Sequence, residues 1–141
     1  FGVITSIEAV LPEMLARGRG RIAAVSSLGA DRGMPRYGAY CASKAAVNTY
    51  MDALRIQIRG RGVTVTTLCP GFVRTAMIHG VQRPMRYILE PDDAARRMVR
   101  AVERGVAVYR FPWQASLFMR FVRLLPDWVI AREMNKASQS R

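Results

Sequence analysis

The sequence predicts an α/β fold in which a parallel, doubly wound sheet carries helices on both faces. Helical and strand-like segments alternate along the chain, the strand-like segments are short and mostly apolar, and 50% of the residues are hydrophobic. A strand that is apolar throughout, rather than at every second position, is typical of a parallel sheet buried on both faces. The 141 residues are enough for one domain with a hydrophobic core, or for part of one.

The first half of the chain is predicted to contain a helix, a strand, a loop and a second helix. Apolar residues recur at helical spacing over 2–17 and stop at a Gly-Arg-Gly turn. The apolar run 21–26 predicts the first strand. Residues 29–38 contain several glycines and a proline and predict a loop, whereas 39–59 predict a long helix that ends at Gly60.

The second half continues the alternation. The β-branched run 63–69 predicts a second strand, which the following Pro-Gly pair ends. A proline followed by two acidic residues predicts the start of a helix over 91–104, because proline suits the first turn and acids favour the positive end of the helix dipole. Residues 106–111 predict a third strand, and helices are expected over 113–125 and after Pro126.

Composition narrows the function classes. The net charge of +12 comes from arginines spread along the chain, with no run of five or more, which favours solvated faces and no nucleic-acid partner. Cys41 and Cys69 form neither a C-x-x-C pair nor a cluster with His79, so neither a metal site nor a disulfide framework is expected. The N-terminal residues match neither a signal nor a transit peptide, and a cytoplasmic location is expected.

Tyr40 and Lys44 stand four residues apart on a predicted helix and therefore share one face. A tyrosine hydroxyl titrates near pKa ~10, and a neighbouring ammonium group favours the phenolate, so such a pair can serve as a general acid and base. A hydroxyl from Ser26 or Ser27, at the carboxyl end of the preceding strand, could hydrogen-bond a carbonyl group held beside Tyr40. Alone, the pair is a weak signal, because two common residues often recur at this spacing.

Three motifs, which follow one another in the sequence, make the signal of the Tyr40–Lys44 pair more specific. They are Gly-Arg-Ile-Ala-Ala-Val-Ser-Ser at 20–27, Tyr-Cys-Ala-Ser-Lys at 40–44 and Cys-Pro-Gly-Phe-Val-Arg-Thr at 69–75. The set resembles the short-chain dehydrogenase/reductase family, and the resemblance runs from Phe1 to about Gly105. It implies a Rossmann-like fold and an oxidoreductase that transfers a hydride between NAD or NADP and a secondary alcohol or ketone.

The resemblance also implies a role for each matching residue. Ser27, thirteen residues before Tyr40, matches the serine that polarises the substrate oxygen, which leaves Ser26 as a structural residue. Tyr40 matches the proton donor or acceptor, and Lys44 matches the residue that promotes its ionisation and hydrogen-bonds the nicotinamide ribose. Both Tyr40 and Lys44 are expected to contact the cofactor. The loop that holds the nicotinamide is matched by Pro70, Gly71, Val73 and Thr75.

The resemblance covers only the C-terminal part of the family's domain. The glycine-rich phosphate turn, the cofactor selector and the Asn-Ala-Gly segment of the family have no match here. The Gly-Arg-Gly at 18–20 precedes a strand, whereas a dinucleotide-binding fingerprint follows one. We therefore expect residues 1–141 to form the C-terminal part of a single NAD(P)-binding domain that lacks its N-terminal dinucleotide-binding strands. Alone, such a chain should neither bind NAD(P) nor be active.

Residues 74–89 lack clear periodicity and lie where the family has a flap over its substrate. The apolar residues of this segment favour an apolar substrate. They are Met77, Ile78, Met85, Tyr87, Ile88 and Leu89.

Residues 111–141 are expected to form an amphipathic helical tail. Within 113–125 the apolar residues gather on one helical face, made of Trp113, Leu117, Phe118, Phe121, Val122, Leu124 and Leu125. This face could pack on its own domain, on a sister subunit of a homo-oligomer, or on an anionic membrane surface. The segment is too short to span a bilayer, which needs about 20 apolar residues. The alternative to an enzyme is therefore a non-catalytic fragment or a membrane-surface binding protein.

Overall fold

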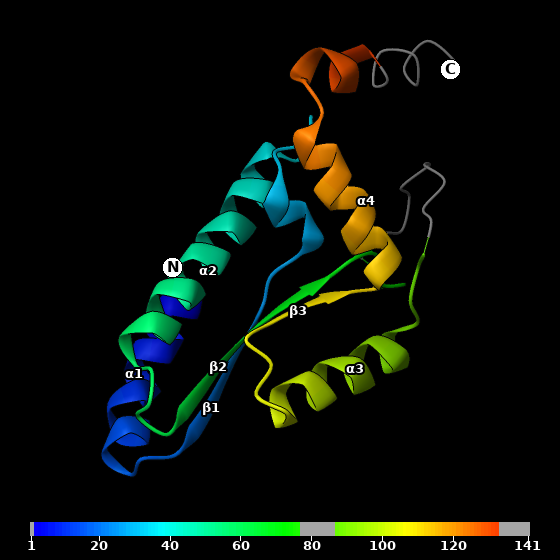
Figure 1. Ribbon diagram of the computed structural model, residues 1–141. Helices are drawn as coiled ribbons and strands as arrows, with labels where there is room; N and C mark the ends of the chain where they lie inside the picture. The colour runs from blue at the N-terminus through cyan, green and yellow to red at the C-terminus, as the bar shows by residue number, and fades with distance from the viewer. Residues whose placement is uncertain (1, 77–86, 133–141) are drawn as a thin grey trace.

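The computed structural model describes residues 2–76 and 87–132 (Figure 1). In chain order its elements are α1 (Gly2–Ala16), β1 (Gly20–Val25), the 3-10 helix η1 (Leu28–Asp31), α2 (Gly38–Gln57), β2 (Val63–Pro70), α3 (Pro91–Glu103), β3 (Val108–Phe111) and α4 (Trp113–Leu124). A further helical segment spans 127–132. The predicted helices and strands are confirmed, whereas η1 was expected to be loop. Most of the expected flap, 77–86, lies outside the described residues.

The strands form a parallel sheet in the order β1-β2-β3. Gly20 of β1 pairs with Val63 of β2, and Thr67 of β2 pairs with Val108 of β3. Parallel neighbours require a crossover, which α2 and α3 supply. Figure 1 shows α1 and α2 on one side of the sheet and α3 on the other, so the predicted doubly wound α/β architecture is confirmed.

The main core lies between the sheet and the α1–α2 pair. Its buried members are Ile7, Ile22, Ala24, Met51, Leu54, Ile58 and Val65. In β1 the buried residues alternate with exposed ones, and Val25 is 50% exposed. In β2 residues 65–69 are all buried. Within the described part of the chain, β2 is therefore covered on both faces, whereas β1 is covered on one.

Arg55 ties α2 to the sheet. Its guanidinium group donates hydrogen bonds to the Val65 carbonyl oxygen at 3.1 Å and to the Thr67 hydroxyl at 2.8 Å. A third hydrogen bond, at 2.9 Å, goes to the carbonyl oxygen of Ala107, just before β3. Because these bonds reach β2 and the segment leading into β3, they fix the position of the helix that carries Tyr40.

α4 packs its inner side on η1 and β3. Val122 is only 8% exposed, whereas Trp113 is 69% exposed. At about 100° per residue these two positions lie on opposite sides of a helix. The predicted apolar face is therefore divided: Val122, at one edge of it, packs inward, whereas Trp113, at the other edge, is exposed. Among the described residues, no helix combines the length and the apolar character needed to cross a membrane.

Gly62 lies where the turn before β2 meets the turn before β1. Its φ is +76°, and a Cβ atom there would lie 1.8 Å from the carbonyl oxygen of Gly18. Gly62→Ala should therefore lower the free energy of unfolding by about 3 kcal/mol or more, measured by urea denaturation. Gly60→Ala is the matched control: its φ is +80°, but nothing lies within 4 Å, so only the backbone cost of about 1–2 kcal/mol applies. Equal losses in the two variants would contradict this close approach.

Candidate active site

Two serines follow β1, and the structure gives them different surroundings. Ser26 is buried, and its hydroxyl donates a hydrogen bond to the carbonyl oxygen of Lys44 at 3.0 Å. The Ser27 oxygen accepts a hydrogen bond from the backbone N–H of Gly29 at 3.0 Å and so caps η1. No described residue accepts a hydrogen bond from the Ser27 hydroxyl. Its proton is therefore available to a ligand, whereas that of Ser26 is committed to the backbone.

Tyr40 and Lys44 lie together on the first turns of α2. The Lys44 ammonium nitrogen lies 5.9 Å from the centre of the Tyr40 ring, a separation that allows a cation–π interaction. The same nitrogen donates a hydrogen bond to the carbonyl oxygen of Val25 at 2.9 Å. Tyr40 is 39% exposed. The pair therefore stands at the carboxyl end of β1, where open α/β sheets bind their ligands.

Ser27 and Tyr40 approach each other across Gly29. A Cβ atom on Gly29 would lie 3.4 Å from the Ser27 hydroxyl oxygen and 3.5 Å from Cε1 of Tyr40. Glycine therefore leaves open the space that both side chains border. Together with Lys44 these residues form a group that we call the Ser-Tyr-Lys set. The sequence pattern does not single out Gly29, because glycines in loops serve many purposes.

Pro70 and Gly71 lie at the end of β2, close to the last residue of β3. The backbone N–H of Gly71 donates a hydrogen bond to the carbonyl oxygen of Phe111 at 2.7 Å. That N–H is therefore engaged by the sheet and is not available to a ligand in this arrangement.

Val73 forms an isolated parallel bridge with Leu89, on the far side of the undescribed segment. The backbone N–H of Arg74 donates to the Leu89 carbonyl oxygen at 2.9 Å, and the Arg74 side chain pairs with Glu90 at 2.8 Å. Thr75 is exposed. Among the described residues it makes no hydrogen bond to the Ser-Tyr-Lys set, so the structure does not join it to that set.

Cys69 precedes this loop and is buried. Burial is the largest cause and raises the pKa of its thiol; the positive charge of Arg110 lowers it and the negative charge of Asp31 raises it, with a net upward shift. A thiol with a raised pKa stays neutral at physiological pH, and thiolates are the reactive form. Cys69 therefore acts as a packing residue behind the site.

Arg32 anchors the loop that follows Ser27, a contact that the sequence does not predict. Its guanidinium group donates hydrogen bonds to the carbonyl oxygens of Arg123 at 2.8 Å and Leu125 at 2.7 Å. It also pairs with the Asp127 carboxylate. These partners lie 91, 93 and 95 residues further along the chain, so no local pattern could reveal them. The contact holds the end of α4 against the loop beside the site.

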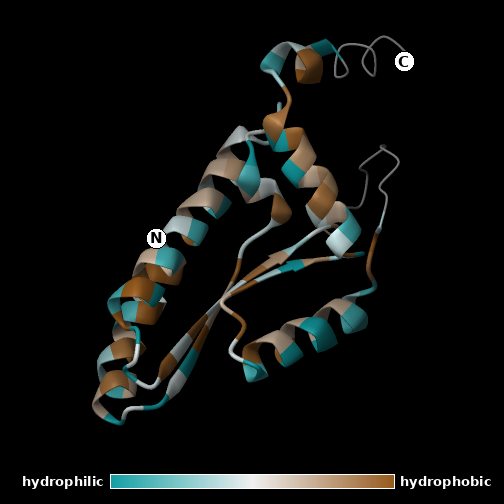
Figure 2. Ribbon diagram, in the orientation of Figure 1, coloured by the Kyte–Doolittle hydropathy of each residue, from teal (hydrophilic) through white to brown (hydrophobic). Residues whose placement is uncertain are grey.

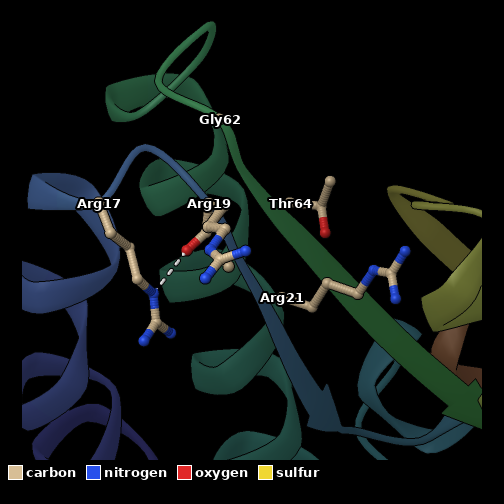
Figure 3. Close-up of a pocket in the computed structure, with 6 residues that line it drawn as sticks. Arg17, Arg19, Arg21, Gly62 and Thr64 are labelled. Carbon is tan, nitrogen blue, oxygen red and sulfur yellow. Dashed lines mark hydrogen bonds between the residues drawn. The ribbon is translucent and has the colours of Figure 1, made fainter.

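A cavity of about 560 Å³ lies at the opposite, amino-terminal edge of the sheet (Figure 3). It is lined by Arg17, Arg19, Gly20, Arg21, Gly62 and Thr64. Arg17 is engaged by Glu13 at 3.1 Å and by the carbonyl oxygen of Arg19 at 2.9 Å, and Figure 3 shows Arg21 pointing away from both arginines. Because ligands of open α/β sheets bind at the carboxyl edge, this cavity is not the candidate active site.

Comparison with known proteins defines the class of this chain. Residues 1–86 match the family described as short chain dehydrogenase. The chain therefore belongs to the short chain dehydrogenase family, and the resemblance seen in its sequence is confirmed.

Two relatives of this chain are longer than the chain itself. An uncharacterized oxidoreductase of Myxococcus xanthus is 40% identical over 126 residues, which cover 89% of this chain and 50% of that protein. Dehydrogenase/reductase SDR family member 7B of Danio rerio is 42% identical over 113 residues, or 72% of this chain and 37% of that protein. The chain thus spans half or less of the length of these relatives.

Solved structures share the fold. A short chain dehydrogenase from Burkholderia cenocepacia in complex with NADP has a TM-score of 0.77 at 23% identity, covering 94% of this chain and 56% of that one. A short-chain dehydrogenase from Streptomyces avermitilis has a TM-score of 0.71 at 23% identity, covering 99% and 59%. These likenesses confirm the Rossmann-like fold.

Proposed function

We propose that this chain supplies the catalytic part of an NAD(P)-dependent oxidoreductase acting on a secondary alcohol or ketone. The observation that carries the proposal is the gathering of Ser27, Tyr40 and Lys44 at the carboxyl end of β1, around the open space above Gly29. Family membership supports it. So does a gluconate 5-dehydrogenase from Burkholderia cenocepacia, solved with NADP and tartrate, which has a TM-score of 0.55 at 27% identity and covers 59% of this chain and 33% of that one.

The residues present fit a nicotinamide cofactor. Lys44 uses one of its three N–H donors on Val25, so the others remain for a ribose hydroxyl. The exposed Thr75 hydroxyl and the backbone N–H of Val73, which no described residue binds, would hold the carboxamide. When bound, the cofactor supplies or accepts the hydride.

The chain's own groups would handle the proton. In the oxidation direction the Tyr40 phenolate oxygen takes the proton of the substrate hydroxyl, and in the reduction direction it returns a proton to the substrate oxygen. The Lys44 ammonium group, 5.9 Å from the ring centre, stabilises the negative charge of the phenolate. The Ser27 hydroxyl donates a hydrogen bond to the substrate oxygen and so offsets the charge that develops there.

The two serines provide a test of this assignment. We would fuse the N-terminal half of the Myxococcus xanthus relative to this chain, and we call the product the chimera. In the chimera, Ser27→Ala should lower turnover about 100-fold, because a hydrogen bond to the reacting oxygen is lost. Ser26→Ala removes only a hydrogen bond to the backbone, so it should cost about 1–3 kcal/mol of stability and little turnover.

Reduced nicotinamide would be followed by absorbance with a panel of secondary alcohols and ketones, and stability by urea denaturation. A larger loss of turnover in Ser26→Ala than in Ser27→Ala would show that Ser26, and not Ser27, hydrogen-bonds the substrate oxygen.

A further inference from the structure

α4 turns a large apolar surface outward. Figure 2 shows apolar stretches along this helix. Five large side chains on α4 are 60 to 81% exposed: Trp113, Leu117, Phe118, Phe121 and Leu124. At about 100° per residue they fall within an arc of roughly 140°. We call these five residues the α4 outer face.

The helix that presents this face is fixed at both ends. At its start, α4 packs against the end of β2, since a Cβ atom on Gly71 would lie 3.3 Å from Pro112 Cδ and 3.5 Å from the Ala115 Cβ. At its end, the Arg32 guanidinium group binds the carbonyl oxygens of Arg123 and Leu125, which would otherwise lack partners in the last turn. The outer face is therefore exposed on an anchored helix rather than on a frayed end.

Positive charge borders the α4 outer face. Arg120 and Arg123 lie on one flank of it, and α4 contains no acidic residue. Neither arginine forms a salt bridge with any residue in 2–76 or 87–132. Packing two copies of α4 together would bring like charges close with no acid on either helix to balance them. An anionic surface would match both the apolar face and its charged flank.

We propose that the α4 outer face is an interfacial anchor that binds an anionic membrane surface. The apolar side chains would enter the boundary between headgroups and acyl chains, and Arg120 and Arg123 would meet lipid phosphates. Trp113 and Trp128 are the protein's two tryptophans, and both are more than two thirds exposed. Aromatic residues of this kind favour the membrane interface. The proposal does not depend on the oxidoreductase function.

Tryptophan fluorescence provides a direct readout, because Trp113 belongs to the α4 outer face and the other tryptophan, Trp128, follows the end of α4 and is also exposed. We would add vesicles of phosphatidylcholine alone, or with phosphatidylserine, to the chain and to the chimera. Binding to the anionic vesicles should shift the emission to the blue and be about 10-fold stronger than binding to neutral ones, and salt should weaken it. Co-sedimentation would measure the affinities.

Paired variants distinguish membrane binding by the α4 outer face from non-specific binding by other exposed apolar residues. Phe118→Ser combined with Phe121→Ser should weaken binding about 10-fold or more, because two apolar side chains no longer enter the interface. The matched control is Ile56→Ser, which removes a side chain that is 72% exposed on α2 and should leave binding unchanged.

The same comparison applies to charge. Arg120→Gln with Arg123→Gln should weaken anionic binding about 10-fold. Arg17→Gln with Arg19→Gln, at the opposite edge of the sheet, is the control and should not.

The proposal would be overturned if the protein did not bind anionic vesicles, or if it bound neutral vesicles equally well. It would also be overturned if only the control variants bound more weakly, or if the chain bound vesicles and the chimera did not. A change from dimer to monomer in the phenylalanine variant, seen by sedimentation without any vesicle binding, would assign the face to a second copy instead.

Discussion

Tyr40→Phe is expected to lower turnover of the chimera ~100- to 10,000-fold, the usual contribution of a positioned proton-transfer group. Phenylalanine keeps the ring that lies 5.9 Å from the Lys44 ammonium nitrogen and loses only the hydroxyl. Cofactor affinity should therefore change little. Steady-state kinetics would measure turnover, and cofactor fluorescence would measure affinity.

The chain offers a matched control for this substitution. Tyr37 caps the start of α2 and is also exposed, but its side chain makes no capping hydrogen bond. Tyr37→Phe should leave both turnover and cofactor affinity close to those of the unaltered chimera. Near-normal turnover in Tyr40→Phe would contradict the proposed mechanism.

Lys44→Met should lower turnover and cofactor affinity together, turnover by about 100-fold and affinity by about 10-fold. The substitution removes the charge beside the Tyr40 ring and the N–H donors proposed for the ribose. It also removes the 2.9 Å hydrogen bond to the Val25 carbonyl oxygen, which should cost about 1 kcal/mol of stability.

Lys44→Arg separates charge from geometry, because it keeps a positive charge on a bulkier, planar group. If charge alone mattered, turnover would recover in this variant. We expect only partial recovery. If Lys44→Met lowered turnover but left cofactor affinity unchanged, Lys44 would not be a ligand of the ribose.

The elements were predictable because their signals are local. The proline and acids at the start of α3 mark its first turn correctly. The predicted start of β3 at 106 was two residues early for a physical reason. The Val106 N–H bonds the Ala101 carbonyl oxygen at 3.0 Å and Gly105 has a φ of +63°, the pattern of a Schellman helix end. Residue 106 therefore still belongs to the end of α3.

The site was predictable only in part. Tyr40 and Lys44 come together because residues four apart share a helix face, which the sequence shows. The approach of Ser27 to Tyr40 depends on how η1 folds back, and η1 was expected to be loop.

Contacts between residues that are distant in the sequence could not be predicted from local sequence patterns. The anchoring of α4 by Arg32 depends on partners more than 90 residues away. An amphipathic pattern likewise predicts that a helix has an apolar side, but does not say whether that side faces the protein. Only the structure shows that Val122, at one edge of the apolar face, packs inward, whereas Trp113, at the other edge, is exposed.

The central claim is that Tyr40 supports hydride transfer between a nicotinamide cofactor and a carbon that bears oxygen. The most direct test incubates the chimera with oxidised NAD or NADP and secondary alcohols carrying deuterium on the carbinol carbon, then measures deuterium in the reduced cofactor by mass spectrometry. We expect deuterium on the nicotinamide ring with the unaltered chimera and at least about 100-fold slower labelling with Tyr40→Phe. Labelling at the same rate in both proteins, or none with the unaltered chimera, would contradict this claim.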